Sequence, residues 1–315
     1  MVKKYIVKTL AIIGAVALVF VIFGLIQDYG AELENTDQLS QQDIQHVKSF
    51  ELPDSLYFAG ERVPLENFDT RESLDRELNT TAYFHSSTML LIKRSNRYFP
   101  LIEPILREYG IPDDFKYLAV AESNLENTVS PVGARGFWQF MNSTAVEYGL
   151  KINDEVDERY HLEKSTAAAC RYFRKSYEKY GDWTMVAASY NRGSNGVDNL
   201  IDMQEQDNYY DLLLPEETSR YLFRILAFKT IFSNPEAYGF EIPEDHLYPP
   251  LKYTTINIDT TVNSFAEFAA VFGTNYKILK ALNPWLRQPY LKVSAGESYE
   301  IKIPVDGART KAYEF

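Results

Sequence analysis

The sequence predicts a mainly α-helical protein that ends in a small α+β domain. Apolar residues recur at helical spacing in several stretches between residues 74 and 228. After Pro249-Pro250 the pattern changes to an alternating, β-branched run over 253–258. The 315 residues, of which 45% are hydrophobic, are enough for two modest domains, each with its own core.

The first 55 residues predict an exported or membrane-anchored chain. A basic segment, residues 1–8 with Lys3, Lys4 and Lys8, precedes an uncharged run, 9–26, and acidic residues follow it. The basic end should stay in the cytoplasm, so the remainder is expected in the cell envelope. The run suits a transmembrane anchor at the periplasmic face of the inner membrane, or a cleaved signal sequence. We favour the anchor, and residues 27–55 read as a polar linker.

Composition excludes several classes of function. The net charge is −12, from 44 acidic and 32 basic residues, and no basic block follows the first ten residues, so nucleic acid is not an expected partner. Cys170, the single cysteine, lies in an Ala-rich run and is expected to be buried and inert. The four histidines have no metal-ligand spacing. The sequence therefore predicts no metal and no cofactor.

Residues 112–140 place a carboxylate where a helix would normally carry a hydrophobic residue. Pro112 suits a helix start, and Phe115, Leu118, Ala119 and Glu122 then follow at the spacing of a buried stripe. Burial would raise the pKa of Glu122 and make it a general acid near neutral pH. The alternative is that Glu122 ends a short helix and bends into solvent.

The residues just downstream favour the buried position. Residues 130–136 form a turn-rich loop, and the segment 137–141, Phe-Trp-Gln-Phe-Met, sets one amide among large aromatic residues. Such a surface can stack on sugar faces while the amide of Gln139 binds a hydroxyl or acetamido group.

The remaining helices of this part are predicted from their caps and spacing. Residues 74–109 read as helical, Thr144-x-x-Glu147 has the form of a capping box, and 151–164 read as a surface loop. Residues 165–180 form a core helix that Gly181 ends, and Asp182 caps the next helix, which delivers Tyr190 and Asn191 to a turn.

A further helix is expected to start at Pro215. Its stripe contains Glu217, Tyr221, Ile225 and Phe228, which would point Glu217 toward the core. The alternative is a first-turn glutamate that favours the helix dipole.

The C-terminal part predicts a β-α-α-β order. A strand over 253–258 is followed by a helical run over 264–272, a Gly-Thr-Asn turn, a second helical run to residue 282, and a strand over 298–304.

Four motifs together resemble the lytic transglycosylases of the soluble-transglycosylase, goose-lysozyme-like superfamily, in the branch of membrane-bound murein transglycosylase D. They are Glu122-Ser123 with Ser130; Gly133-Ala134-x-Gly136-Phe137-Trp138-Gln139 continuing through 142–150; Ala188-Ser189-Tyr190-Asn191-Arg192-Gly193; and residues 215–221, which contain Glu217-Thr218-x-x-Tyr221. The match runs from about residue 75 to 232. It implies a lysozyme-like helical catalytic domain, expected over 56–248.

The resemblance also implies a reaction and a set of site residues. The reaction is cleavage of the β-1,4 bond between N-acetylmuramic acid and N-acetylglucosamine in peptidoglycan glycan strands, with a 1,6-anhydro product. Glu122 is the expected catalytic residue. The expected substrate-binding residues are Ser123, Ser130, Gln139, Met141, Tyr190 and Asn191, and the expected supporting residues are Gly136, Trp138, Glu217 and Tyr221.

Two other functions stay open at this point. A hydrolytic muramidase on the same scaffold would need a second carboxylate to activate water, and Glu126, one turn beyond Glu122, is available by spacing. A non-catalytic protein that binds peptidoglycan as a tether is the other alternative. An intact buried acid argues against the tether.

The C-terminal part resembles the LysM module, which binds glycans containing N-acetylglucosamine. Residues 282–284, Leu-Asn-Pro, and Ile303-Pro304 carry the resemblance, which implies a LysM-like domain over 249–306 and a tail over 307–315. The Gly-Asp-Thr-Leu of the module is replaced by Ile258-Asp259-Thr260-Thr261. Either the domain still binds glycan, or it has become a packing domain.

Overall fold

The computed structural model describes residues 21–23, 47–310 and 313, and the chain divides into two units, Met1–Ser49 and Phe50–Phe315. Only residues 21–23 of the expected anchor or signal segment are described, and they are helical. Within the described ranges, no helix has both the length and the apolar character that a bilayer span needs. Phe50 and Leu52, which the sequence placed in the linker, pack against the helical core.

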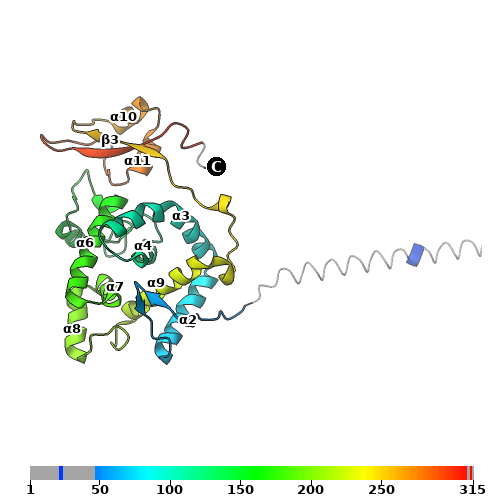
Figure 1. Ribbon diagram of the computed structural model, residues 1–315. Helices are drawn as coiled ribbons and strands as arrows, with labels where there is room; N and C mark the ends of the chain where they lie inside the picture. The colour runs from blue at the N-terminus through cyan, green and yellow to red at the C-terminus, as the bar shows by residue number, and fades with distance from the viewer. Residues whose placement is uncertain (1–20, 24–46, 311–312, 314–315) are drawn as a thin grey trace, which may run out of the picture. The chain divides into compact units, whose positions relative to one another are not determined.

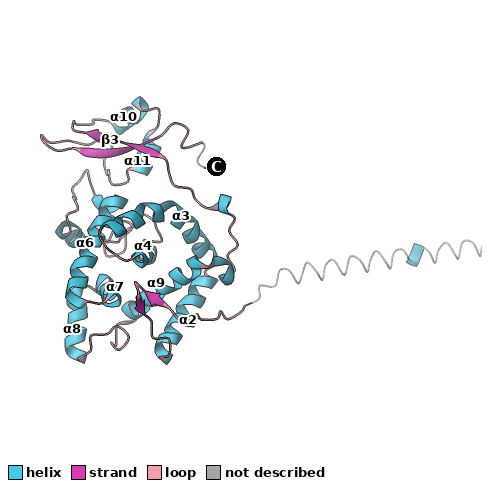
Figure 2. Ribbon diagram, in the orientation of Figure 1, coloured by secondary structure: helices cyan, strands magenta, loops and turns pink. Residues whose placement is uncertain are grey.

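The larger unit begins with a helical domain, as predicted (Figures 1 and 2). A short hairpin precedes the helices, with strands β1 (Tyr57–Phe58) and β2 (Glu61–Arg62) of two residues each. The helices are α2 (Phe68–Tyr83), α3 (His85–Glu108), α4 (Lys116–Ser123), α5 (Asn142–Glu147), α6 (Leu162–Tyr180), α7 (Trp183–Arg192), α8 (Ser194–Gln204) and α9 (Glu216–Ser233).

The short helix α4 lies at the centre of this domain. In Figure 1 it sits inside the arc formed by α3, α6, α7 and α9, and its residues Leu118, Ala119 and Val120 have no exposed surface. Helix α9 packs against α2, α4 and α7. Burying apolar side chains on all sides of α4 is the main stabilising term for so short a helix, because an isolated helix of this length is unstable in water.

The structure confirms most of the predicted helix ends. Helix α6 ends at Gly181, whose φ of 67° is the left-handed conformation that favours glycine. The side chain of Asp182 then accepts a hydrogen bond of 2.8 Å from the backbone N–H of Met185 and begins α7. The predicted capping box is wrong. Thr144 lies inside α5, and Glu147 instead pairs with Lys175 of α6 at 2.9 Å.

The C-terminal domain has the predicted β-α-α-β order. Strands β3 (Tyr253–Ile258) and β4 (Tyr299–Pro304) pair antiparallel with Ile256 opposite Ile301, and α10 (Phe265–Val271) and α11 (Tyr276–Leu282) lie between them in sequence. The buried Asn283 joins α11 to β4, because its Nδ2 donates to the carbonyl of Lys302 at 2.7 Å and its Oδ1 accepts from the N–H of Lys302 at 2.8 Å.

The prediction of a surface loop over 151–164 is wrong. Five consecutive residues from Val156 to Tyr160 are buried, and Val156 and Tyr160 belong to the core of the C-terminal domain. The backbone N–H of Asp157 donates to the carbonyl of Trp285 at 2.9 Å, and the guanidinium of Arg287 lies 4.2 Å from the ring centre of Tyr160. The charged residues suggested exposure to solvent, but in the folded protein they pair with one another, which allows the segment to be buried.

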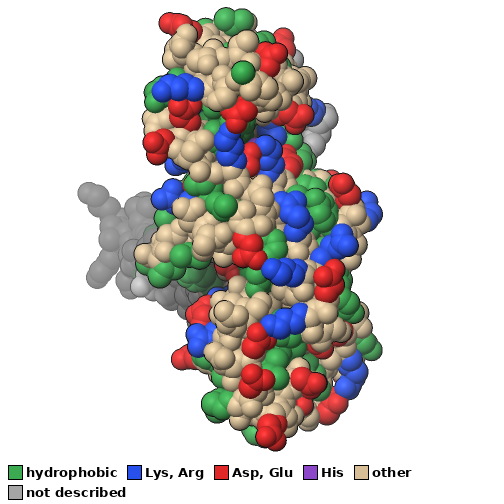
Figure 3. Space-filling view, turned by 90° about the vertical axis from the view of Figure 1, so that its left-hand side faces the viewer, with side chains coloured by type: hydrophobic (Ala, Val, Ile, Leu, Met, Phe, Trp, Pro, Cys, Tyr) green, Lys and Arg blue, Asp and Glu red, His purple; other side chains and the backbone are tan. Residues whose placement is uncertain are grey.

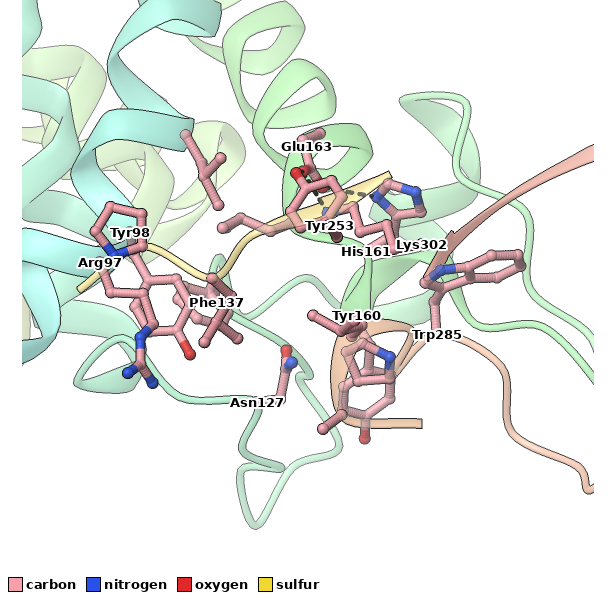
Figure 4. Close-up of a pocket in the computed structure, with 17 residues that line it drawn as sticks. Arg97, Tyr98, Asn127, Phe137, Tyr160, His161, Glu163, Tyr253, Trp285 and Lys302 are labelled. Atoms are coloured by element: carbon pink, nitrogen blue, oxygen red, sulfur yellow. Dashed lines mark hydrogen bonds and ion pairs between the residues drawn. The ribbon is translucent and has the colours of Figure 1, made fainter. Parts of the chain in front are cut away.

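A small cavity of about 90 Å³ lies between this segment, α3 and the C-terminal domain. In Figure 4, His161, Glu163, Tyr253 and Lys302 gather on one side of it. Although burial acts in the opposite direction, the hydrogen bond from His161 and the positive charge of Lys302 hold the pKa of Glu163 well below its ordinary value. These contacts join the two domains within the unit Phe50–Phe315.

The surface carries charges of both signs. On the face drawn in Figure 3, Lys and Arg side chains are interspersed with Asp and Glu. On this face, the mixture of signs gives no extended positive field that would attract a polyanion.

A substitution of Trp285 tests the packing between the C-terminal domain and the segment 151–164. Its ring stacks on Tyr299 at 5.9 Å and lies 5.5 Å from the ring of His161. We expect Trp285→Ala to lower the free energy of unfolding by about 3–5 kcal/mol, as is typical of deleting a buried aromatic side chain. Val271→Ala, at a position 79% exposed in the same domain, should change it by about 0.5 kcal/mol or less. Urea denaturation of both variants measures the free energy of unfolding. An equally small change in both variants would contradict the importance of Trp285 for this packing.

Candidate active site

Glu122 lies in the last turn of α4, on the buried stripe that the spacing predicted. Phe115, Leu118 and Ala119, the earlier members of the stripe, have no exposed surface. Asn124 then ends the helix in the left-handed conformation, with φ of 56°. Glu122 itself is partly buried and lines a cavity. It therefore lies on the predicted stripe but is less completely buried than the earlier members.

This environment favours the protonated form of Glu122. Burial raises its pKa to about 7, although the hydrogen bond from Tyr221 acts in the opposite direction. The Tyr221 hydroxyl donates to Glu122 Oε1 at 2.5 Å. The negative charge of Glu217 raises the pKa further and the positive charge of Arg224 lowers it. A carboxyl group with a pKa near neutrality can give a proton and take it back at the same pH.

The cavity next to Glu122 has a volume of about 500 Å³. Among the described residues that line it, Glu122 is the one carboxylate. The others are Ser130, Val132, Ala134, Gln139, Phe140, Met141, Thr144, Tyr172, Tyr190, Asn191, Arg192 and Gly193. Five of the six expected substrate-binding residues therefore line the cavity, together with aromatic and small residues from α6 and the loop before α5.

The loop before α5 is held by a close approach of two backbone segments. Gly136 has φ of 80°, and a Cβ atom at this position would lie 1.9 Å from the carbonyl oxygen of Arg159. No other residue fits there without displacing the backbone. Gln139 has φ of 48°, and its Nε2 donates to the carbonyl of Gly136 at 2.7 Å and to Thr128 Oγ1 at 3.2 Å. Part of the Gln139 amide thus holds the shape of the loop.

Tyr190 lines the cavity, and the buried Trp138 lies behind it. Trp138 is fully buried, and its Nε1 donates to Thr166 Oγ1 at 2.9 Å. The Tyr190 hydroxyl donates to the carbonyl of Trp138 at 2.6 Å, and its ring meets that of Tyr172 edge-on at 5.1 Å. Burial and the nearby charge of Glu122 raise the pKa of Tyr190 well above its ordinary value, so it remains a neutral hydrogen-bonding group.

Several other expected site residues have defined partners. Ser130 Oγ accepts from the N–H of Ala134 at 3.0 Å, and Asn191 Oδ1 accepts from Thr218 Oγ1 at 2.9 Å. Met141 is exposed at the rim. Ser123 does not line the cavity, because its buried hydroxyl donates to the carbonyl of Ala119 at 3.1 Å within the helix.

The prediction that Glu217 points toward the core is wrong. Tyr221, Ile225 and Phe228 of its stripe are buried, but the side chain of Glu217 is 70% exposed. It lies in the first turn of α9, before the helix enters the core, and Arg224 is 3.8 Å away. It influences Glu122 through its charge, without a hydrogen bond.

Glu126 is also outside the cavity. It is exposed and forms an ion pair with Arg94 of α3. A carboxylate held there by its own counter-ion is poorly placed to activate a water molecule in the cavity next to Glu122.

Other residues of the site were not foreseen from the sequence. Arg192 and Tyr172 line the cavity, and the buried pair Asp157–Arg159 holds the loop, because Arg159 Nη1 donates to the carbonyl of Phe140 at 3.3 Å. The hydrogen bond from the Tyr221 hydroxyl to Glu122 joins residues 99 positions apart. No local pattern in the sequence signals contacts of this range.

The fold and the site define the class of this protein. Residues 101–212 match the family described as transglycosylase SLT domain, and residues 254–307 match the soluble lytic transglycosylase C-terminal LysM-like domain. The chain therefore contains an SLT domain followed by a LysM-like domain, which confirms the resemblance. The exact limits expected for the domains stay predictions.

Curated relatives agree with these matches. The chain is similar to the membrane-bound lytic murein transglycosylase D of Escherichia coli strain K12 and of Escherichia coli O6:H1. In both cases the identity is 27% over 222 residues, which is 69% of this chain and 48% of the relative. The chain thus spans about half the length of the curated relatives it matches.

Because the pKa of Glu122 is raised in the folded protein, the free energy of unfolding should depend on pH. Below pH 4.5, the ordinary value, the carboxyl is protonated in both the folded and the unfolded chain. Between pH 4.5 and about 7 the unfolded chain ionises first, so the folded state loses stability as pH rises.

Glu122→Gln removes this ionisation and keeps an oxygen that accepts from Tyr221. We expect the variant to gain about 3 kcal/mol in unfolding free energy, relative to the parent, between pH 4.5 and pH 8. Urea denaturation at several pH values measures the gain. A difference that does not change with pH would show that Glu122 titrates in the folded protein as it does in the unfolded chain.

Proposed function

We propose that this protein is a peptidoglycan lytic transglycosylase that cleaves the β-1,4 bond between N-acetylmuramic acid and N-acetylglucosamine and leaves a 1,6-anhydro end. The observation that carries the proposal is the placement of Glu122, a carboxyl group with a pKa of about 7 and the one carboxylate among the described residues lining the cavity. The SLT match and the relatives support the same activity.

In the first step, Glu122 acts as the general acid. Its proton passes to the glycosidic oxygen as the bond to the anomeric carbon of the muramic residue breaks, and the N-acetylglucosamine side leaves with a hydroxyl group. Glu122 becomes a carboxylate. The hydrogen bond from Tyr221 stabilises this charged form, which offsets part of the cost of leaving a charge in a buried place.

In the second step, the same carboxylate acts as the base. It takes the proton of the C6 hydroxyl of the muramic residue while the C6 oxygen attacks the anomeric carbon of its own sugar. The bond that forms closes the 1,6-anhydro ring and returns Glu122 to its protonated form. One acid with a pKa near the working pH serves both steps, so no second carboxylate is needed.

The other lining residues are proposed to bind the sugars. Met141 and Phe140 offer apolar surface to the sugar faces, and Gln139, Ser130 and Asn191 offer polar atoms at the cavity wall. Tyr190 keeps its ring against Tyr172 and its hydroxyl on Trp138, so it holds this wall of the cavity in place. The LysM-like match supports the same polymer as the partner of the C-terminal domain.

The product tests this function. Purified protein incubated with sacculi should release muropeptides with anhydro ends, which are lighter by one water than hydrolysed muropeptides and resist reduction by borohydride. Liquid chromatography with mass spectrometry distinguishes the two. Glu122→Gln should lose more than the roughly 10²–10⁴-fold that general acid–base catalysis supplies.

Glu126→Gln is the matched control and should keep the activity of the parent. Products that are all reducible by borohydride would instead identify a hydrolytic muramidase. Loss of activity in Glu126→Gln would identify a second catalytic carboxylate.

We further propose that residues 9–26 hold the protein at the periplasmic face of the inner membrane. The basic residues before this uncharged run and the acidic residues after it support the orientation. The E. coli relatives are named as membrane-bound enzymes.

If the segment is an uncleaved anchor, the full chain should stay in the membrane fraction after a high-salt wash, which removes proteins held by charge alone. Mass spectrometry of the N-terminus checks this. A mature chain that begins after residue 26 and is found in the soluble exported fraction would contradict the anchor.

A further inference from the structure

A second cavity adjoins the one that contains Glu122. It has a volume of about 510 Å³ and is lined by residues of α5, α6 and the start of α8. Four residues line both cavities: Thr144, Tyr172, Arg192 and Gly193. Because the two spaces share these walls, a branched molecule held next to Glu122 can extend a branch into the second cavity.

The second cavity has a positive lining, although the whole chain carries a net charge of −12. Its charged residues are Lys175, Lys179, Arg192 and Glu147. Lys175 pairs with Glu147 at 2.9 Å, and Lys179 pairs with Asp198, which does not line the cavity. The lining therefore keeps an excess of positive charge, and Arg192 is the charged residue that lines both cavities.

Arg192 differs from the two lysines. It is exposed, and the described part of the chain supplies it with no ion pair or side-chain hydrogen bond. Its side chain lies across the first turn of α8, where a Cβ atom at Gly196 would come within 2.8 Å of Arg192 Cγ. The glycine leaves room for the arginine side chain beside α8, and the five N–H donors of its guanidinium stay available where the two cavities meet.

We propose that Arg192 binds a carboxylate of the peptide stem carried by the muramic residue, and that the second cavity receives that stem. The proposal rests on the proposed function. The hydroxyl and acetamido groups of the glycan are neutral, whereas a stem peptide carries free carboxylates on a branch of the sugar. A guanidinium binds a carboxylate through two parallel hydrogen bonds, which neutral sugar groups cannot match.

The substrate that tests this is available in two forms. Glycan strands can be used with their stems, or after an amidase has removed the stems and left the lactyl carboxylate on each muramic residue. The quantity measured is the ratio of kcat/KM on stem-bearing strands to kcat/KM on stripped strands. For Arg192→Gln we expect this ratio to fall about tenfold, the size of one charge-assisted hydrogen bond.

Arg174→Gln is the matched control, since Arg174 is an exposed arginine of α6 that lines neither cavity. Its ratio should equal that of the parent. An unchanged ratio in Arg192→Gln would overturn the proposal. A rise in the ratio would place Arg192 on the lactyl carboxylate of the sugar, and would overturn it as well.

Binding separates this proposal from the proposed function. In the Glu122→Gln background, where cleavage is not needed, sedimentation with stem-bearing or stripped strands measures retention directly. Adding Arg192→Gln should weaken retention on stem-bearing strands about tenfold and reduce its dependence on salt. Equal retention with and without Arg192→Gln would refute stem binding, whatever reaction the protein catalyses.

Discussion

The approach of Gly136 to the carbonyl oxygen of Arg159 joins two segments that would otherwise be independent loops. One segment, residues 130–141, lines the cavity next to Glu122. The other, residues 151–164, packs against the C-terminal domain and contributes Val156 and Tyr160 to its core. A Cβ atom at Gly136 would have to occupy a position 1.9 Å from that oxygen, so the shape of the cavity wall depends on a contact that only glycine permits. The C-terminal domain is thereby part of the structural support of the site.

The charges behind this contact explain why the arrangement is stable. Asp157 and Arg159 form an ion pair of 2.8 Å in which each side chain is 4% exposed. Removing Asp157 would leave the buried guanidinium of Arg159 without its ion-pair partner, at a typical cost of about 3–5 kcal/mol. The same guanidinium donates to the carbonyl of Phe140, so the pair also satisfies loop carbonyls that water does not reach. The segment can be buried although its sequence is polar, because its charged side chains pair with one another.

Sequence patterns predicted those parts of the structure that depend on neighbours along the chain. The stripe ending in Glu122, the end of α6 at Gly181, the cap at Asp182 and the β-α-α-β order all follow from spacing of a few residues, and all are present. Motif resemblance added Tyr190, Gln139 and Trp138 to the site. Their hydrogen bonds and lining positions show them close together, although the residues span 52 positions in the sequence.

The failures have a common physical cause. Glu217 shares the spacing of a buried stripe, but spacing does not tell how far a helix projects beyond the core. Residues 151–164 look solvated because nothing local shows that Trp285 and Arg287 will cover them. Thr144 and Glu147 fit the form of a cap, yet Glu147 finds Lys175 on another helix. In each case the packing of segments distant in sequence decides the outcome, and a pattern of seven or fewer residues cannot contain that information.

Cys170 gives the protein a practical property. It is the single cysteine in the sequence, it has no exposed surface, and burial raises the pKa of its thiol to about 12. At pH 8 about one thiol in ten thousand would be ionised, and the ionised form is the one that reacts with maleimides. A cysteine introduced on the surface would therefore be labelled almost alone. Spectroscopic probes could be placed on the rim of the cavity and on the C-terminal domain without first removing a native residue.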